Sequence, residues 1–246
     1  KMTTRLELLP DVYLTAVQTS RFKTACFSLS FLRPLRQEEA GMNALLPSVL
    51  LRGSESAPSI RAIADRLDAL CGASVGSLVR KKGEIQLTGL FADGLEDRYA
   101  GEPVFSRLLE LTAELLLRPR TQGGVFVPQI IMQERQKLLD TIESTLDDKA
   151  EYCQTQLLRQ MCCGEAYAVG RLGEAGPLAA VDEAALWAHY QKVLSSSRAE
   201  LFYLGSKPAQ EVAALLRPLL KDLPRGARPC PRGRGHRARI RHPHRE

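Results

Sequence analysis

GMNALLPSVLLRGS, residues 41–54, is the stretch from which the fold of this chain is worked out. It follows Glu38 and Glu39, whose negative charges suit the positive N-terminal end of a helix, and glycine at position 53 suits a helix end. We therefore predict a helix from about residue 38 to residue 51. Pro47 lies inside it, lacks the N–H that would bond the carbonyl of residue 43, and is expected to kink the helix axis.

Strand patterns lie on both sides of this helix. Residues 12–17 (VYLTAV) and 25–32 (ACFSLSFL) are typical of half-buried strands and are predicted to form an antiparallel pair. Residues 74–79 and 84–91 predict a hairpin about the turn RKKG, and residues 200–205 predict a further strand.

The remaining body is mostly helical in pattern. Predicted helices start after Ser59, before Leu108, near Pro128, at Asp182 and at Pro208, and the one from Pro128 is expected to bend at Asp147-Asp148. The order β-β-α-α-β-β-α-α-α-β-α predicts an α+β domain, with a mostly antiparallel sheet and helices packed on one face.

Composition limits the class of protein. The chain has 246 residues, 44% of them hydrophobic, and neither a transmembrane run nor a signal peptide, so we expect no membrane partner and a cytoplasmic location. Its six cysteines include no C-x-x-C pair and are expected to be free thiols. The vicinal pair Cys162-Cys163 could be joined only with strain; a redox or metal role for it is the alternative interpretation.

The positive charge of the chain is concentrated at one end. Eight arginines and one glutamate give residues 225–246 a net charge of +7, so the preceding residues carry −1 of the total of +6. A nucleic-acid or lipid-binding arm and a Cys/His metal site are two interpretations of this tail. We favour a third, sequence without selected meaning, because the composition changes abruptly at Pro224 and resembles out-of-frame translation of a GC-rich gene. We predict one domain over 1–223 and a disordered tail over 224–246.

An inverted zinc motif, H-x-x-E-H, directs two imidazoles and a carboxylate from one helix face. Active M16 metallopeptidases of the insulinase type carry it within G-x-x-H-F-x-E-H-x-x-F-x-G-T. Residues 41–54 align with this motif: the glycines persist, but Ala44, Pro47 and Ser48 replace the zinc ligands and the base. Together with the order of elements over about residues 11–221, the stretch resembles an M16 domain, which implies an M16 peptidase-like (LuxS/MPP-like) fold.

The third zinc ligand of the active enzymes is missing as well. In the family it is a glutamate seven residues after a Glu-Arg pair; here the pair is Glu134-Arg135, and the later position is Thr141. Asp140 and Glu143 flank it but would point about 100° and 200° away on a helix. His189 is the single histidine of the body, and as a lone helical histidine it is expected to be a surface or half-buried packing residue. We therefore predict no catalytic residue, no metal and no cofactor.

Four segments resemble, more closely, a non-catalytic bacterial M16 subgroup associated with aminopentanol modification of elongation factor P. In that subgroup the Leu-Pro pair inside the first helix is the normal state. The matching segments are RFKT (21–24), NALLPSVLLRGS (43–54), LDALCGASVGSLVRKKGEIQ (67–86) and YQKVLSSS (190–197). The resemblance implies an inactive subunit that pairs with a zinc-bearing M16 chain as a hetero-oligomer, helps enclose a peptide or unfolded segment, and belongs to a protein with a second M16-like domain.

One glycine-rich loop could be taken for a binding site. The loop from Gly164 to Gly173 follows a helix and lacks a Gly-Lys-Ser/Thr ending, so it does not predict a phosphate site. Tyr167 in this loop is a candidate peptide contact, with packing as the alternative.

Two functions remain open at this point. One is a non-catalytic binding or scaffolding subunit with no nucleic-acid partner, and the other is an independent metallopeptidase with displaced zinc ligands. Zinc content and chelator-sensitive turnover separate the two.

Overall fold

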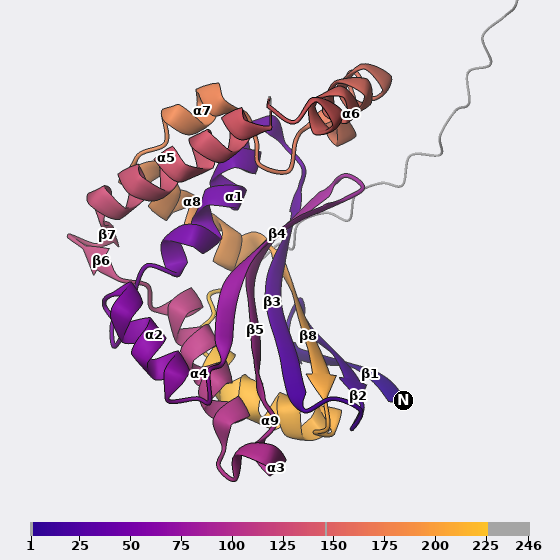
Figure 1. The fold of residues 1–246 in the computed structure, drawn as a ribbon, viewed down its shortest axis with the longest axis vertical. Coiled ribbons are helices and arrows are strands. Elements are labelled where there is room, and N and C mark those ends of the chain that lie inside the picture. The colour runs from indigo at the N-terminus through magenta and orange to yellow at the C-terminus, as the bar shows by residue number, and fades with distance from the viewer. Residues whose placement is uncertain (1, 146, 226–246) are drawn as a thin grey trace, which may run out of the picture.

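The computed structural model describes residues 2–145 and 147–225 of the chain. Its main sheet has six strands in the order β1-β2-β8-β3-β5-β4 (Figure 1). The strands are β1 (Met2–Leu9), β2 (Val12–Gln18), β3 (Thr24–Pro34), β4 (Ser74–Lys82), β5 (Ile85–Leu95) and β8 (Arg198–Gly205), and β6 (Thr121–Gln122) with β7 (Val125–Phe126) forms a separate two-stranded sheet.

One predicted strand pairing is wrong. β2 and β3 do not pair, because β8 lies between them: it runs parallel to β2, with Leu14 opposite Leu201, and antiparallel to β3, with Leu29 opposite Leu201. The β2–β8 pair is the one parallel pair among the described strands, so the prediction of a mostly antiparallel sheet is confirmed. The hairpin of β4 and β5 is also confirmed, with its turn at Gly83 (φ 58°).

The helices cover one face of the sheet (Figure 1). Helices α1 and α4 contact β5, and α9 contacts β1 and β2. The helices are α1 (Gln37–Leu50), α2 (Ile60–Asp68), α3 (Asp97–Ala100), α4 (Val104–Leu117), α5 (Pro128–Ser144), α6 (Lys149–Met161), α7 (Ala175–Ala179), α8 (Glu183–Ser196) and α9 (Ala209–Leu220), with the 3-10 turn η1 (Ala166–Ala168) after α6.

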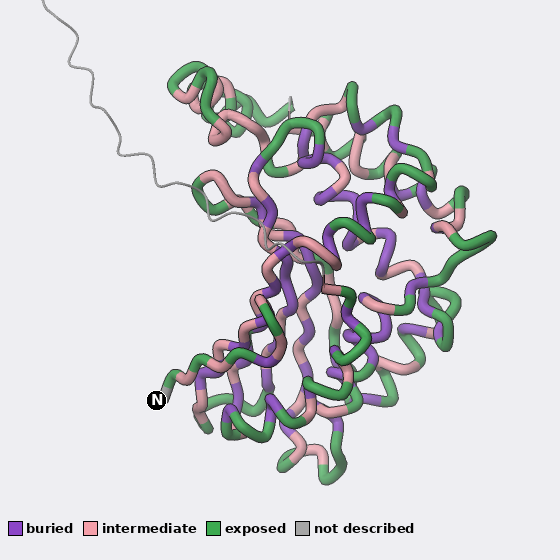
Figure 2. Tube along the Cα trace, turned by 180° about the vertical axis from the view of Figure 1, so that it is seen from behind, coloured by how far each residue is buried: buried purple, intermediate pink, exposed green. Residues whose placement is uncertain are grey.

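The core lies between this helical layer and the sheet, where buried residues concentrate (Figure 2). Along β3 the odd-numbered residues from Ala25 to Arg33 are buried under the helices, whereas Cys26, Ser28 and Leu32 lie on the opposite face and are half-buried. This period of two leaves the second face of the sheet uncovered by the described helices. The predicted α+β architecture with helices on one face is confirmed.

Pro47 is accommodated inside α1, which continues to Leu50. The carbonyl of Asn43, which would otherwise accept the N–H of residue 47, instead accepts a hydrogen bond from the Thr88 hydroxyl of β5 at 2.6 Å. A side chain of the sheet therefore satisfies the backbone group that the proline leaves free.

Several local predictions are confirmed by their hydrogen bonds. Ser59, Asp148 and Asp182 each cap the following helix by accepting backbone N–H groups, and Asp148 marks the break between α5 and α6. The elements β1, α3, β6, β7 and α7 were not predicted. Apart from Pro224 and Arg225, the predicted disordered tail lies outside the described residues, as does Cys230.

Candidate functional site: the former zinc helix

The structure brings together the two helices that would carry a zinc site. Helix α1 packs against α5, so the stretch with Ala44, Pro47 and Ser48 lies beside the helix with Thr141 (Figure 1). Ala44 and Pro47 are buried and Ser48 is half-buried. Thr141 is exposed, and its hydroxyl donates to the Lys137 carbonyl one turn earlier at 2.8 Å.

The chemistry of these four side chains does not fit zinc. A catalytic zinc site takes three imidazole, carboxylate or thiolate ligands, and a methyl group, a proline ring and two neutral hydroxyls supply none of them. Within residues 2–145 and 147–225, no group of three or more His, Cys, Asp or Glu side chains is placed to hold a metal ion. No step of metal-dependent hydrolysis can therefore be derived from this site.

A buried hydrogen-bond network begins one residue before the first former ligand. Asn43 is fully buried; its Nδ2 donates to Gln86 Oε1 at 2.8 Å, and its Oδ1 lies 2.7 Å from His189 Nε2. Gln86 Nε2 in turn donates to the carbonyls of Ala40, at 3.0 Å, and Arg171, at 2.7 Å. The network ties α1, α8, β5 and the loop after η1 to one another.

His189 is more deeply buried than the surface or half-buried position expected from the sequence. It is 5% exposed and acts as a hydrogen-bond partner of Asn43. Because Asn43 Nδ2 donates to Gln86, Asn43 Oδ1 must accept, and His189 Nε2 carries the proton. Burial lowers the pKa of His189 to about 4, against an opposing attraction from Glu39, so the imidazole is neutral near pH 7.

An ion pair lies close to this network at the start of α1. Arg33 of β3 and Glu39 of α1 are both buried, and Arg33 donates through Nε and Nη2 to Glu39 Oε2, at 3.2 and 2.5 Å. Lys192 of α8 donates to the other carboxylate oxygen at 2.6 Å. Burial opposes ionisation of Glu39, but the bonds from Lys192 and Arg33 outweigh it and lower its pKa to about 2.

The backbone is closely packed around residues 41 and 53. A Cβ at Gly173 (φ 77°) would overlap the backbone of Gly41, so the loop after η1 lies directly on the start of the motif. Gly53 (φ 157°) leaves no free space either, since a Cβ there would lie 3.0 Å from the Pro58 backbone. Ser54 donates to buried Glu114 at 2.6 Å. These contacts hold both ends of residues 41–54 against the neighbouring loops and α4.

Tyr167, the candidate peptide contact, is half-buried in η1 and lies against the β4–β5 hairpin. Lys81 Nζ is 4.0 Å from the centre of its ring and donates to the carbonyls of Tyr167, at 2.5 Å, and Val169, at 2.9 Å. The ring therefore helps fix the loop to the hairpin. Contact with a peptide stays a prediction.

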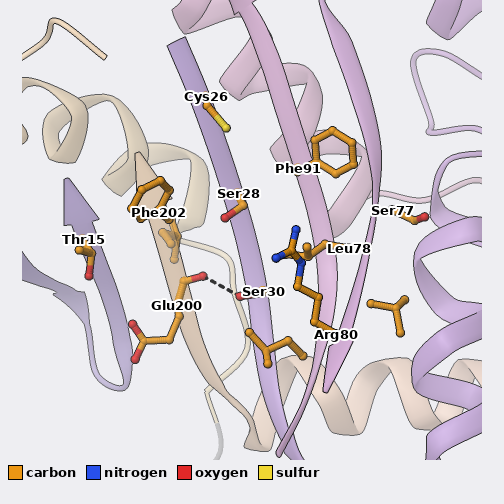
Figure 3. Close-up of a pocket in the computed structure, with 13 residues that line it drawn as sticks. Thr15, Cys26, Ser28, Ser30, Ser77, Leu78, Arg80, Phe91, Glu200 and Phe202 are labelled. Carbon is orange, nitrogen blue, oxygen red and sulfur yellow. Dashed lines mark hydrogen bonds between the residues drawn. The ribbon is translucent and has the colours of Figure 1, made fainter. Parts of the chain in front are cut away.

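A hollow of about 660 Å³ lies on the uncovered face of the sheet (Figure 3). Ser28 and Ser30 of β3 form its floor, with Phe91 of β5 on one side and Phe202 of β8 on the other. The remaining lining residues are Thr15, Cys26, Ser77, Leu78, Val79, Arg80, Leu87, Glu200 and Leu201.

Sequence reasoning missed Asn43, Gln86 and Thr88. Gln86 and Thr88 alternate with the apolar residues Ile85 and Leu87, so the sequence pattern favoured a solvent-facing position for them, whereas the structure buries them. The five described cysteines are free, as predicted. In the described part of the chain, none of the helices is both long and apolar enough to cross a bilayer.

The chain was compared with known proteins. No protein-family model matches it. A curated relative from Bacillus subtilis, named probable inactive metalloprotease YmfF, is 30% identical over 202 residues, which are 81% of this chain and 47% of the relative.

Solved structures share the fold. A conserved protein from Enterococcus faecalis superposes with a TM-score of 0.83 at 26% identity, over 91% of this chain and 53% of the other. A peptidase M16 inactive domain from Pseudomonas fluorescens superposes with a TM-score of 0.73 at 17% identity, over 94% and 53%. The chain thus spans about half the length of the relatives that it matches. The chain is thus similar in sequence to a protein named a probable inactive metalloprotease, and it has the fold of M16-like peptidase domains.

Proposed function

We propose that this chain is a non-catalytic M16 subunit, which contributes binding surface and no chemistry to a peptidase assembly. The observation that carries the proposal is which residues occupy the positions aligned with the zinc motif. The motif's glycines persist, while Ala44, Pro47, Ser48 and Thr141 stand where the zinc ligands and the base would be. No described cluster of donor groups favours displaced zinc ligands, so a metallopeptidase of its own is not our proposal.

The proposed partner is a zinc-bearing M16 chain, in a hetero-oligomer. Support comes from the half-length match to the relatives, which makes further M16-like domains a natural partner for a chain of this size. A second such domain within the natural protein and a role linked to elongation factor P modification in the cytoplasm complete the proposal. The resemblance of the four quoted segments motivates both.

We further propose that the subunit holds an extended peptide along the outer edge of β4. That strand ends the described six-stranded order and pairs only with β5 there, so its outer N–H and C=O groups are available to an added strand. Tyr167, close to the tip of the same hairpin, is the side chain proposed to contact the peptide.

Mixing the full chain with a zinc-bearing M16 chain from the same organism tests the pairing. We expect a complex with the summed mass by light scattering, and peptide turnover that is chelator-sensitive. Replacing the glutamate of the partner's H-x-x-E-H motif, which acts as general base, should abolish that turnover. Ser48→Ala and Thr141→Ala in this chain should leave it unchanged. Turnover by this chain alone, or no complex at about 10 μM, near the weak end of specific pairing, would contradict the proposal.

Proline substitution tests the β4 edge. Alternate residues of an edge strand point their N–H groups toward the sheet and away from it, so one of Ser77→Pro and Leu78→Pro should leave the β4–β5 ladder intact. That folded variant should lose peptide affinity while keeping the partner complex. Unchanged peptide affinity in that folded variant would remove β4 from the proposal.

A further inference from the structure

We infer that the loop between β2 and β3, together with α3, forms a binding surface for an acidic segment of a partner protein. This surface, which we name the basic-aromatic patch, consists of Arg21, Phe22 and Lys23 of the loop and Arg98 and Tyr99 of α3. It includes no residue of α1 or β4, so the inference goes beyond the proposed function.

Hydrogen bonds join the two parts of the patch. Nη2 of Arg98 donates to the carbonyls of Ser20, at 3.1 Å, and Phe22, at 3.4 Å. The N–H of Glu96 donates to the Lys23 carbonyl at 2.9 Å. The loop and the start of α3 are therefore held as one surface, at the lower end of the molecule in Figure 1, where α3 lies.

Two aromatic side chains of the patch are open to solvent. Phe22 is 53% exposed and Tyr99 is 48% exposed. The guanidinium carbon of Arg98 lies 4.7 Å from the centre of the Tyr99 ring, and the same side chain bonds the Phe22 backbone, so it links the two aromatic residues. Aromatic and arginine side chains are enriched at protein interfaces and among the residues that dominate binding there. Because the loop is already fixed, little ordering is needed on binding, which favours affinity.

The exposed charges of the patch are positive. Arg21 and Lys23 are exposed, and neither forms an ion pair with any of the described residues. The side chain of Arg98 is 41% exposed. A group of cations that lacks nearby carboxylate partners attracts the carboxylates of a binding partner.

The two carboxylates beside the patch already have partners. Glu96 is 4% exposed and accepts hydrogen bonds from the backbone N–H of Ser206, at 2.5 Å, and from its hydroxyl. Asp97 pairs with Lys207 Nζ at 3.1 Å. Glu96 Oε2 also lies 3.9 Å from Arg98 Nε and offsets part of that one charge. The positive field outside the patch is therefore set mainly by the two cations of the loop.

The charge of the body favours an acidic peptide segment over a nucleic acid. A nucleic acid binds through many phosphate contacts along a basic surface, whereas residues 1–224 together carry a net charge of −1. The patch instead concentrates a few cations and two aromatic rings on a small area. A short segment with carboxylates around an apolar side chain complements this arrangement, because its carboxylates pair with the cations and its apolar side chain covers Phe22 and Tyr99.

Fluorescence anisotropy with the full chain and the dye-labelled peptide EDFEDLEDFE tests the inference. At about 50 mM NaCl we expect a Kd on the order of 10–100 μM. Raising NaCl to about 300 mM should weaken binding at least about threefold, because salt screens exposed charges. The peptide QNFQNLQNFQ, which lacks the charges, should bind at least about tenfold more weakly, and EDSEDSEDSE, which lacks the apolar side chains, at least about threefold more weakly.

Substitutions locate the binding surface. Arg21→Gln together with Lys23→Gln should weaken binding of EDFEDLEDFE at least about tenfold, and Phe22→Ala at least about threefold. The matched control is Lys149→Gln together with Tyr152→Ala on α6, which also removes an exposed cation and an exposed aromatic ring and should leave the Kd unchanged. Circular dichroism and urea unfolding check that all variants fold.

Four outcomes overturn the inference. No binding of EDFEDLEDFE to the folded chain at about 500 μM removes the surface, and a Kd that the patch variants share with the wild type places the peptide elsewhere. Equal binding of QNFQNLQNFQ shows that the cations do not recognise carboxylates. Tighter binding of a dye-labelled oligothymidylate of about twelve nucleotides, at the same salt concentration, makes the patch a nucleic-acid site instead. The zinc-bearing partner experiment decides the proposed function separately in every case.

Discussion

At the scale of single residues, α1 carries a buried hydrogen-bond network beside the positions where the family resemblance would place metal ligands. Asn43 sits next to the first former ligand position and joins His189 to Gln86 in a buried network. A buried polar group is costly unless it is bonded, and here each amide group has a partner. The buried polar residues of this helix therefore contribute to stability.

The neutral state of His189 predicts a pH-dependent stability. Its folded-state pKa, about 4, lies below the ordinary value of 6.5, so the unfolded chain binds a proton first as the pH falls. The contribution of neutral His189 to the free energy of unfolding is fully present above pH 6.5, and it is lost as the pH falls from that value to about pH 4. The free energy of unfolding of the wild type, measured with urea, should fall by about 2 kcal/mol between pH 7 and pH 5.

The variant His189→Gln is the control for this slope. Its side chain does not titrate, so its stability should change little between pH 7 and pH 5. Glu39 and Glu114, whose pKa values bonding partners lower to about 2, contribute only at more acidic pH. Equal slopes for wild type and variant would show that His189 is not the buried neutral group described here.

Gly173 predicts a second residue-scale effect. Gly173→Ala should destabilise the chain by about 3 kcal/mol, because it adds left-handed strain to an overlap with the Gly41 backbone. Gly164 has a similar φ of 82° but open space around it, so Gly164→Ala should cost only about 1 kcal/mol. Thermal and urea unfolding of the two variants compare strain alone with strain plus overlap; equal losses would argue against close packing of the loop on α1.

At the scale of elements, α1 shows how a helix keeps an internal proline. The Thr88 hydroxyl of β5 donates a hydrogen bond to the Asn43 carbonyl, because Pro47 has no N–H to donate. The defect in the helix is thus repaired by the sheet, and the repair also fixes α1 on β5.

A double-mutant cycle measures this repair. Thr88→Val alone should cost about 1–3 kcal/mol, because it leaves a buried carbonyl without a partner. In a Pro47→Ala background the N–H of residue 47 can bond that carbonyl, so the same change should cost less than about 1 kcal/mol. Urea unfolding of the four proteins gives the coupling energy. Additive losses would mean that Thr88 does not compensate for the proline.

Local signals predicted most elements correctly. Ser59 and Asp182 were identified as helix caps, and the β4–β5 hairpin followed from two alternating runs around a turn. The pairing of β2 with β3 failed because insertion of β8 between them is decided by contacts about 170 residues apart, which local periodicity does not contain.

The candidate site, like the fold, could be predicted from the sequence only in part. The assignment of Ala44, Pro47, Ser48 and Thr141 rests on the family resemblance and stays a prediction. The bonds among Asn43, Gln86 and His189 could not be predicted from the sequence, because they depend on how α1, β5 and α8 meet.

At the scale of the whole molecule, helices cover one face of the sheet and leave a hollow open on the other. The network at α1 stabilises the chain, and the β4 edge is the proposed place for a peptide. This division of surfaces suits a subunit that supports catalysis carried out by another M16 chain.

The central claim is that this chain performs no zinc chemistry of its own. It is tested most directly by zinc analysis of the purified full chain together with a peptidase assay in the presence and absence of a chelator. We predict well under about 0.1 zinc per chain after equilibration with micromolar zinc, because the four former positions offer no strong ligand. No chelator-sensitive turnover should be seen. One zinc per chain with turnover that the chelator removes would contradict the account.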